Sequence, residues 1–86
     1  MSNEMVGKIV MYCLDMGDIK ALRHESAQHG VNPFDHGVGE WYPMVIIHQG
    51  YSEDVSGHVF LKGGRKLYVE YVDHGTSPGR WREIEE

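Results

Sequence analysis

The sequence predicts a small, mainly β fold, either a five-stranded barrel of the SH3-like kind or a curled antiparallel sheet, with one short helix in a long first connection. Short runs rich in Val, Ile, Leu, Tyr and Phe follow one another closely after residue 40, and Gly or Pro separates them. Residues 15–40 hold a helix-like stretch and a loop, so we expect a long helical or loop insertion there. At 86 residues the chain is expected to be a single domain, residues 1–86, near the size at which one core is marginal.

The clearest element is a β-hairpin over residues 57–72, GHVFLKGGRKLYVEYV, with a break at Gly63-Gly64. A two-residue loop would pair Leu61 with Lys66 and put charged and apolar side chains on the same face of the hairpin. A three-residue loop puts the apolar core residues on one face and the other side chains on the opposite face, and strand register usually follows such a separation. We therefore expect these cross-strand pairs: Leu61–Leu67, Val59–Val69, Phe60–Tyr68 and His58–Glu70. The face with the aromatic residues is then a subunit contact, part of a core or a ligand site.

Residues 6–14 are expected to form the first strand, and both of its faces are apolar. Cys13 lies in this strand and is expected to be a small buried apolar residue and not a nucleophile. The second and last strands are expected at residues 44–50 and 80–84. The expected core consists of Ile9, Met11, Val45, Ile47, Val59, Leu61, Leu67, Val69 and Trp81.

The long connection begins with a helix-like stretch that Asp18 could cap and Gly30 could end. Its apolar face is narrow, so the helix is only weakly amphipathic. Residues 30–40 have no hydrophobic period and contain Gly and Pro, which predicts a loop. Loops of this length in small domains usually have a function or are ordered by a partner.

The net charge of −5 argues against nonspecific binding to duplex nucleic acid. We expect no membrane span, because no apolar run approaches the roughly 18 residues required, and no secretion signal at the N-terminus. A single cysteine excludes an intramolecular disulfide. Five of the eight basic residues lie in the last third, which suits a small anionic ligand or, alternatively, a solvated surface: Lys62, Arg65, Lys66, Arg80 and Arg82.

The six histidines do not have the spacing of a metal site. His24 and His29 are five residues apart, so they would not share a helix face, and we expect no metal and no cofactor. The tripeptide Asp-His-Gly occurs at residues 35–37 and 73–75. In each, Asp either orients the imidazole of the histidine or is present because Asp and Gly favour turns. The sequence has no nucleophile motif and no phosphate-binding glycine loop. We therefore expect no enzymatic activity.

An ordered set of short matches carries a resemblance across residues 6–82. The set consists of Leu14, Asp18-Ile19, Leu22-Arg23, Gly39, Tyr42-Pro43-Met44-Val45, Val59-Phe60-Leu61, Gly63, Leu67-Tyr68-Val69 and Pro78-Gly79-Arg80-Trp81. It resembles a family of small proteins from actinobacterial phages and prophages, with the patterns D-x-x-x-I-N-x-R-R, Y-P-M-V-V, V-x-L-D-G, L-W-V and P-G-x-W-x-W-P. The sequence departs from the family at residues 22–24 and at residues 82–84. The resemblance implies phage origin and expression in the cytoplasm of an infected host, and it brings no catalytic residues.

From these observations we expect a non-enzymatic, oligomeric binding protein that sequesters a nucleotide-derived signal of host immunity, a counter-defence sponge. The residues expected to bind the ligand are Arg65, Lys66, Arg80 and Arg82 for the phosphates and Trp41, Tyr42 and Tyr68 for the base. The pocket would form between chains, with residues 30–40 as a lid. The alternatives are a virion structural or accessory protein, a partner-binding barrel, and a direct inhibitor of a host enzyme.

Overall fold

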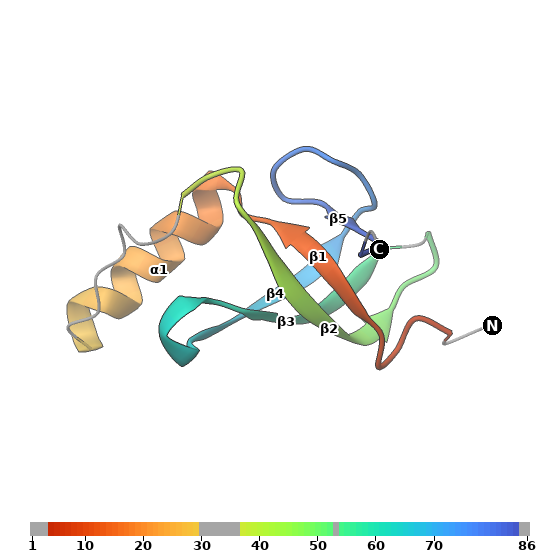
Figure 1. The fold of residues 1–86 in the computed structure, drawn as a ribbon, viewed down its shortest axis with the longest axis horizontal. Coiled ribbons are helices and arrows are strands. Elements are labelled where there is room, and N and C mark those ends of the chain that lie inside the picture. Colours follow the sequence, from red (N-terminus) through yellow and green to blue (C-terminus); the bar gives the residue numbers. More distant parts are fainter. Residues whose placement is uncertain (1–3, 30–36, 53, 85–86) are drawn as a thin grey trace.

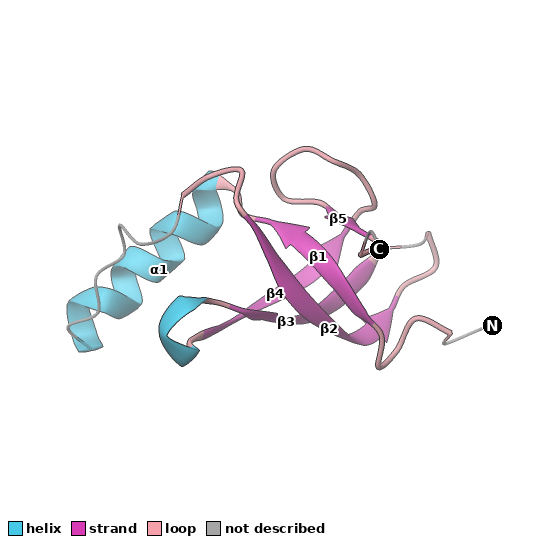
Figure 2. Ribbon diagram, in the orientation of Figure 1, coloured by secondary structure: helices cyan, strands magenta, loops and turns pink. Residues whose placement is uncertain are grey.

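A single antiparallel sheet of five strands forms the body of the protein, in a computed structural model that describes residues 4–29, 37–52 and 54–84. The order across the sheet is β4-β3-β2-β1-β5, and one helix follows the first strand (Figures 1 and 2). The elements are β1 (Ile9–Cys13), α1 (Met16–His29), β2 (Trp41–Gln49), β3 (Val55–Phe60), the short 3-10 helix η2 (Lys62–Gly64), β4 (Lys66–Val72) and β5 (Trp81–Arg82). The expected mainly β fold is confirmed in its curled, open form, because the strand order is linear and the sheet does not close into a barrel.

The core lies on the side of the sheet that carries Val10, Met44 and Val59, and this differs from the expected core in the first two strands. The register pairs Val10 with Met44 and Met44 with Val59, so these three side chains share one face. The expected core residues Ile9 and Ile47 are instead 55% and 45% exposed, and Met11 and Val45 are half-buried. The assignment was wrong because both faces of β1 and β2 are apolar, so an alternating pattern cannot tell the inner face from the outer one.

The expected residues of the hairpin and the last strand are in the core as predicted. Val59, Leu61, Val69 and Trp81 are buried, and Leu67 is half-buried against them. Trp81 reaches the core because β5 pairs with β1.

The hairpin register is shifted by two residues from the expected one. Phe60 pairs with Lys66 and His58 with Tyr68, so neither expected aromatic-face pair forms. Five residues, 61–65, make the connection, which the Leu61 N–H closes by donating to the Arg65 carbonyl oxygen at 2.8 Å. Gly63 and Gly64 both have a φ of 75°, and two left-handed positions allow this longer turn. A shift of two residues changes the partners and keeps each side chain on its face.

Helix α1 begins at Met16, two residues before the expected cap at Asp18. Asp15 Oδ1 accepts a hydrogen bond from the Asp18 N–H at 2.8 Å, and Asp18 Oδ2 accepts one from the Asp15 N–H at 2.9 Å. This reciprocal pair is the capping box, with Asp15 in the capping position. Ile19 and Leu22 of the first two turns are buried in the core. The expected helix stop at Gly30 and most of the expected lid, residues 30–36, lie outside the described residues.

Candidate functional site

Arg82 and Trp41 come together on the outer face of the sheet, the side opposite the core. Arg82 of β5 pairs with Met11 of β1, and Trp41 of β2 pairs with Cys13 of β1, so both project to the same side. The guanidinium carbon of Arg82 lies 4.3 Å from the centroid of the Trp41 ring. A guanidinium over an indole at this distance makes a cation–π interaction, which is favourable and fixes both groups.

The other expected ligand-binding residues are dispersed. Tyr42 packs against the core, and its hydroxyl donates to Glu40 Oε1 at 2.7 Å. Arg80 is exposed, with its Nη1 3.7 Å from Asp73 Oδ2. Tyr68 lies on β4 with its ring 5.3 Å from the ring of His58.

Arg65 and Lys66 follow the hairpin turn, at the β4 edge of the sheet, whereas Arg80 and Arg82 lie at the β5 edge. The sheet order therefore separates the four basic residues into two pairs. One chain brings Arg82 to Trp41, and it does not gather all four cations around one point.

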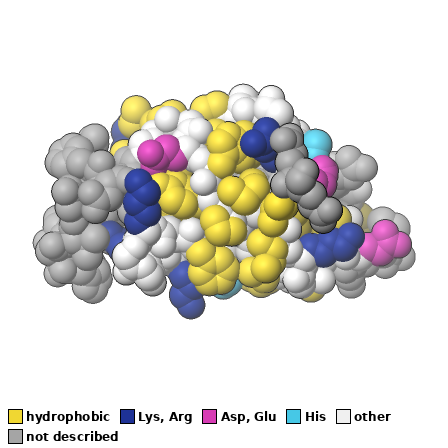
Figure 3. All heavy atoms as spheres, in the orientation of Figure 1, with side chains coloured by type: hydrophobic (Ala, Val, Ile, Leu, Met, Phe, Trp, Pro, Cys, Tyr) yellow, Lys and Arg dark blue, Asp and Glu magenta, His cyan; other side chains and the backbone are white. Residues whose placement is uncertain are grey.

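The outer face is rich in exposed and half-buried apolar side chains. Figure 3 shows hydrophobic side chains gathered on the side that β1 and β2 present to the viewer. Ile9 is 55% exposed, Phe60 42% and Tyr68 46%. We define the outer face by the exposed and half-buried side chains that the register places on this side: Ile9, Met11, Trp41, Pro43, Val45, His58, Phe60, Lys66, Tyr68 and Arg82. The sequence indicated an apolar outer face, because β1 and β2 carry apolar residues on both of their sides.

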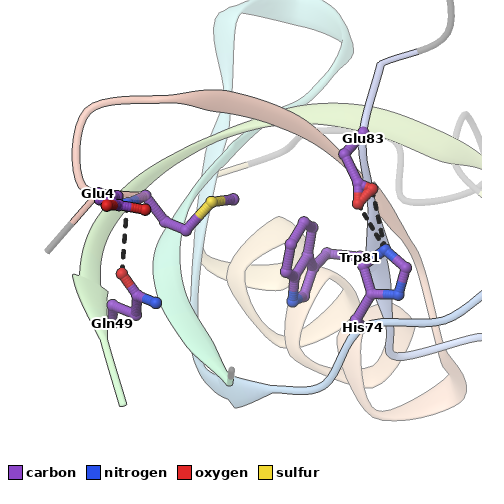
Figure 4. Close-up of a pocket in the computed structure, with 6 residues that line it drawn as sticks. Glu4, Gln49, His74, Trp81 and Glu83 are labelled. Carbon is purple, nitrogen blue, oxygen red and sulfur yellow. Dashed lines mark hydrogen bonds and ion pairs between the residues drawn. The ribbon is translucent and has the colours of Figure 1, made fainter. Parts of the chain in front are cut away.

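A pocket of about 360 Å³ lies on another part of the surface, lined by Glu4, Met5, Gln49, His74, Trp81 and Glu83 (Figure 4). On one side the Met5 N–H donates to Gln49 Oε1 at 3.3 Å. On the other side His74 Nε2 lies 2.7 and 3.0 Å from the two carboxylate oxygens of Glu83. Sequence reasoning missed this pocket, because segments from both ends of the chain form it.

The second Asp-His-Gly tripeptide takes part in this pocket, and its Asp does not orient the imidazole as one of the two sequence interpretations had it. His74 pairs with Glu83 and not with its neighbour Asp73, which faces Arg80. The His74 ring also packs edge-on against the ring of Trp81, with centroids 4.6 Å apart and planes at 85°. His74 therefore connects the carboxylate of Glu83 to the indole of Trp81. The first tripeptide falls mostly outside the described residues.

Cys13 is buried at 2% exposure. Burial raises the pKa of its thiol, and the nearby Arg82 guanidinium offsets only part of that effect. A buried thiol with a raised pKa is a poor nucleophile at neutral pH. Within the described residues, no three or more His, Cys, Asp and Glu side chains are arranged to hold a metal ion. No helix in the described part of the chain is long and apolar enough to cross a bilayer.

Comparison of the chain with protein-family models, curated proteins and solved structures found no match. The resemblance to small phage proteins therefore stays a prediction from the sequence. What the chain does must be argued from its own geometry, that is, from the Trp41–Arg82 stack, the outer face around it and the separate pocket.

Proposed function

We propose that this protein is a non-enzymatic binding protein that holds a flat, anionic, nucleotide-like ligand at the Trp41–Arg82 stack. The observation that carries the proposal is the guanidinium of Arg82 held 4.3 Å above the indole of Trp41. A guanidinium plane offers a surface on which a base can stack, and its N–H groups can donate to two phosphate oxygens at once. The stack thus combines the two kinds of contact that a nucleotide needs.

The outer face around the stack gives the proposal its second part, that the protein acts as a homo-oligomer. One row across the face runs Arg82, Met11, Pro43, Phe60, Lys66, since Pro43 and Phe60 adjoin the paired residues Met44 and Val59. Between its charged ends this row is apolar, so a second copy can cover it without burying a charge.

A two-fold axis that lies in the plane of contact and crosses this row at right angles at Pro43 would place Lys66 of one copy beside Arg82 of the other. Such an arrangement is self-complementary, as two-fold interfaces are. It unites the basic residues that a single chain keeps at opposite edges of its sheet. Two cations side by side repel, and a bound phosphate between them removes that repulsion. Ligand binding and dimer formation would therefore strengthen each other.

The resemblance to phage proteins extends the proposal to the biological role. A small protein in the cytoplasm of an infected cell that binds a nucleotide-derived immune signal, and does not convert it, would lower the free concentration of that signal. To compete at low signal concentration, such a sponge needs a nanomolar constant, equivalent to roughly 12 kcal/mol. A site between two copies provides more contact area for this than one exposed sheet face.

Arg82→Ala is expected to weaken binding of such a ligand at least about tenfold, equivalent to about 1.4 kcal/mol. Calorimetry with cyclic dinucleotides, cyclic trinucleotides and cyclic ADP-ribose isomers measures this. Arg82→Lys should also weaken binding, because lysine keeps the positive charge but lacks the planar guanidinium group. Lys8→Ala is the matched control, since it removes an exposed cation just before β1. The proposal fails if no compound in the panel binds below about 10 µM, or if Lys8→Ala weakens binding as much as Arg82→Ala.

The oligomer has its own test. Light scattering of the wild type is expected to give about twice the chain mass of 9.8 kDa, and Phe60→Lys should reduce it to a single chain. Phe60 is 42% exposed on the outer face, so the added charge would have to be buried in the dimer while the monomer tolerates it. Tyr51→Lys, at a turn residue that is 92% exposed, should leave the mass unchanged. A wild type of single-chain mass in the presence of saturating ligand would contradict the dimer.

The exposed apolar face also favours a second candidate function, a virion or other partner-binding protein in which a different chain covers this face. Two measurements separate the candidates. A protein that binds no nucleotide and is abundant in purified virions has the structural role, whereas a protein that releases an intact nucleotide on heating has the sequestering role.

A further inference from the structure

The pocket beside β5 is built on two walls that the backbone holds in place. On one wall, the Gly7 N–H donates to the Ile46 carbonyl oxygen at 2.7 Å, which fixes the segment that carries Glu4 and Met5 against β2. On the other wall, the Trp81 N–H donates to the Asp73 carbonyl oxygen at 3.0 Å and joins the loop after β4 to β5. The residues that line the pocket differ from those of the outer face and of the Trp41–Arg82 stack, although β5 carries both Trp81 and Arg82.

Trp81 brings a hydrogen-bond donor to this pocket that no described residue accepts. The residue is 5% exposed, and its indole Nε1 has no hydrogen-bond partner within residues 4–29, 37–52 and 54–84. In Figure 4 the corner of the ring that carries Nε1 points away from His74, toward the side of the pocket where Gln49 lies. A buried donor without a partner costs free energy, and indoles in protein interiors usually find an acceptor. An acceptor oxygen supplied by a ligand would satisfy it.

The remaining polar groups of the pocket favour a cation. Glu4 and Glu83 contribute two carboxylates from opposite walls, and none of the described residues that line the pocket is Lys or Arg. His74 Nε2 contacts both oxygens of Glu83, which holds this carboxylate on the side of the pocket where the His74 ring packs against Trp81. Gln49 Oε1 accepts from the Met5 N–H, so its amide NH₂ is the group left to donate to a ligand. A carboxylate at the rim of the pocket and hydrogen-bond donors deeper inside favour a ligand that carries both a positive charge and a hydrogen-bond acceptor.

We infer that this pocket binds an ammonium group with a carbonyl oxygen next to it, the chemistry of an amino-acid amide or of the free amino end of a peptide. The ammonium would lie by Glu83, and the carbonyl oxygen would accept from the Trp81 indole N–H. The volume of about 360 Å³ lies within the range for small-molecule sites, so the pocket is large enough to admit an amino-acid amide or the end of a peptide. This inference does not rest on the nucleotide proposal, because it uses different residues on a different part of the surface.

Titration of the full-length protein with glycinamide, followed by NMR of the two tryptophan indole N–H signals, tests the inference. A Trp41→Phe variant assigns the signal of Trp81. Glycinamide is expected to move the Trp81 signal saturably and to leave the Trp41 signal in place. Acetamide, which has the carbonyl without the ammonium, should have at least about tenfold weaker affinity.

Glu83→Gln should weaken glycinamide binding at least about tenfold, whereas Glu70→Gln, which removes an exposed carboxylate from β4, should not change it. Triglycine amide and its N-acetylated form separate the two sources of the ligand: tighter binding of the free peptide than of glycinamide indicates a peptide end, and the reverse indicates a small molecule. Equal binding of the N-acetylated peptide, equal binding of acetamide, or no saturable movement of the Trp81 signal up to about 10 mM glycinamide overturns the inference.

Discussion

Gly57→Ala is expected to destabilise the protein by about 3 kcal/mol or more, the upper end of the range for overpacked sites. Gly57 lies in the middle of β3, opposite Ile46 of β2 and Val69 of β4. A β carbon at Gly57 would collide with the carbonyl oxygen of Val45 and would lie 3.0 Å from its carbonyl carbon. Backbone atoms of a paired central strand cannot move away without breaking the ladder, so β2 and β3 would have to separate.

Chemical denaturation measures this loss, and Gly37→Ala serves as the control. Among the described residues, a β carbon at Gly37 would meet the side chain of Glu40 alone, at 3.8 Å, which is an ordinary contact. We expect the control to stay within about 0.5 kcal/mol of the wild type. For a small domain with a total stability of about 5–15 kcal/mol, the Gly57 variant should unfold at a clearly lower denaturant concentration. If both variants unfold at the same concentration, the close approach of β2 and β3 is not as described.

The hairpin illustrates which part of a fold the pattern of side chains predicts. The alternation of apolar residues correctly placed Val59, Leu61 and Val69 on the core side. It could not predict the partners, because registers two residues apart leave every side chain on the same face. The left-handed conformations of Gly63 and Gly64 allow the longer turn and so favour the observed register over the expected one.

In β1 and β2 the same pattern gave the wrong face. Ile9 and Val10 are equally apolar, and only pairing with β3 places Val10 on the core side. The apolar residues left outside are the ones that make the outer face. A strand that is apolar on both sides in a single-sheet protein therefore indicates a second surface to be covered, although the sequence does not say which side it is.

The candidate sites depend on contacts between distant parts of the chain. Arg82 reaches Trp41 because a two-residue strand, β5, pairs with β1 at the far end of the sequence. The pairing of His74 with Glu83 needs the loop between β4 and β5 to fold back along Trp81. Local composition predicted a ligand site made of basic and aromatic residues. It could not predict which of these residues come into contact, because local spacing does not encode contacts between residues so far apart in the sequence.

Tyr12→Phe is expected to cost about 1.5–3 kcal/mol at neutral pH, the range for a buried hydrogen bond to a charged group. Tyr12 is 1% exposed, and its hydroxyl donates to Asp18 Oδ2 at 2.6 Å. The same oxygen accepts from the Asp15 N–H in the capping box of α1. Burial, and then the neighbouring Asp18, raise the pKa of Tyr12 well above its usual range, so the hydroxyl keeps its proton and donates throughout the neutral range. Removing it leaves a half-buried carboxylate with one donor fewer.

The loss should depend on pH in a definite direction. Burial raises the pKa of Asp18 above its ordinary value of 3.8, and the hydrogen bond from Tyr12 opposes that shift. A carboxyl group whose pKa is higher in the folded state contributes stability below pH 3.8, and this contribution is lost as the pH rises through the folded-state pKa. Without the Tyr12 hydroxyl the folded-state pKa rises further. The Tyr12→Phe variant should therefore lose most at neutral pH and least near pH 3.8.

Asp18→Asn provides the matched variant, because it removes the charge and keeps an oxygen that can accept from both Tyr12 and the Asp15 N–H. In this background Tyr12→Phe should cost less, about 0.5–1.5 kcal/mol, and the cost should not change between acid and neutral pH. Tyr51→Phe, at a residue that is 92% exposed, should have no effect at either pH. Urea denaturation at several pH values measures all five proteins: the wild type, the three single variants and the Tyr12→Phe, Asp18→Asn double variant. A loss for Tyr12→Phe that is the same at acid and neutral pH in the wild-type background would show that the ionised carboxylate of Asp18 does not depend on Tyr12, and that the connection between the sheet and the start of α1 is held in another way.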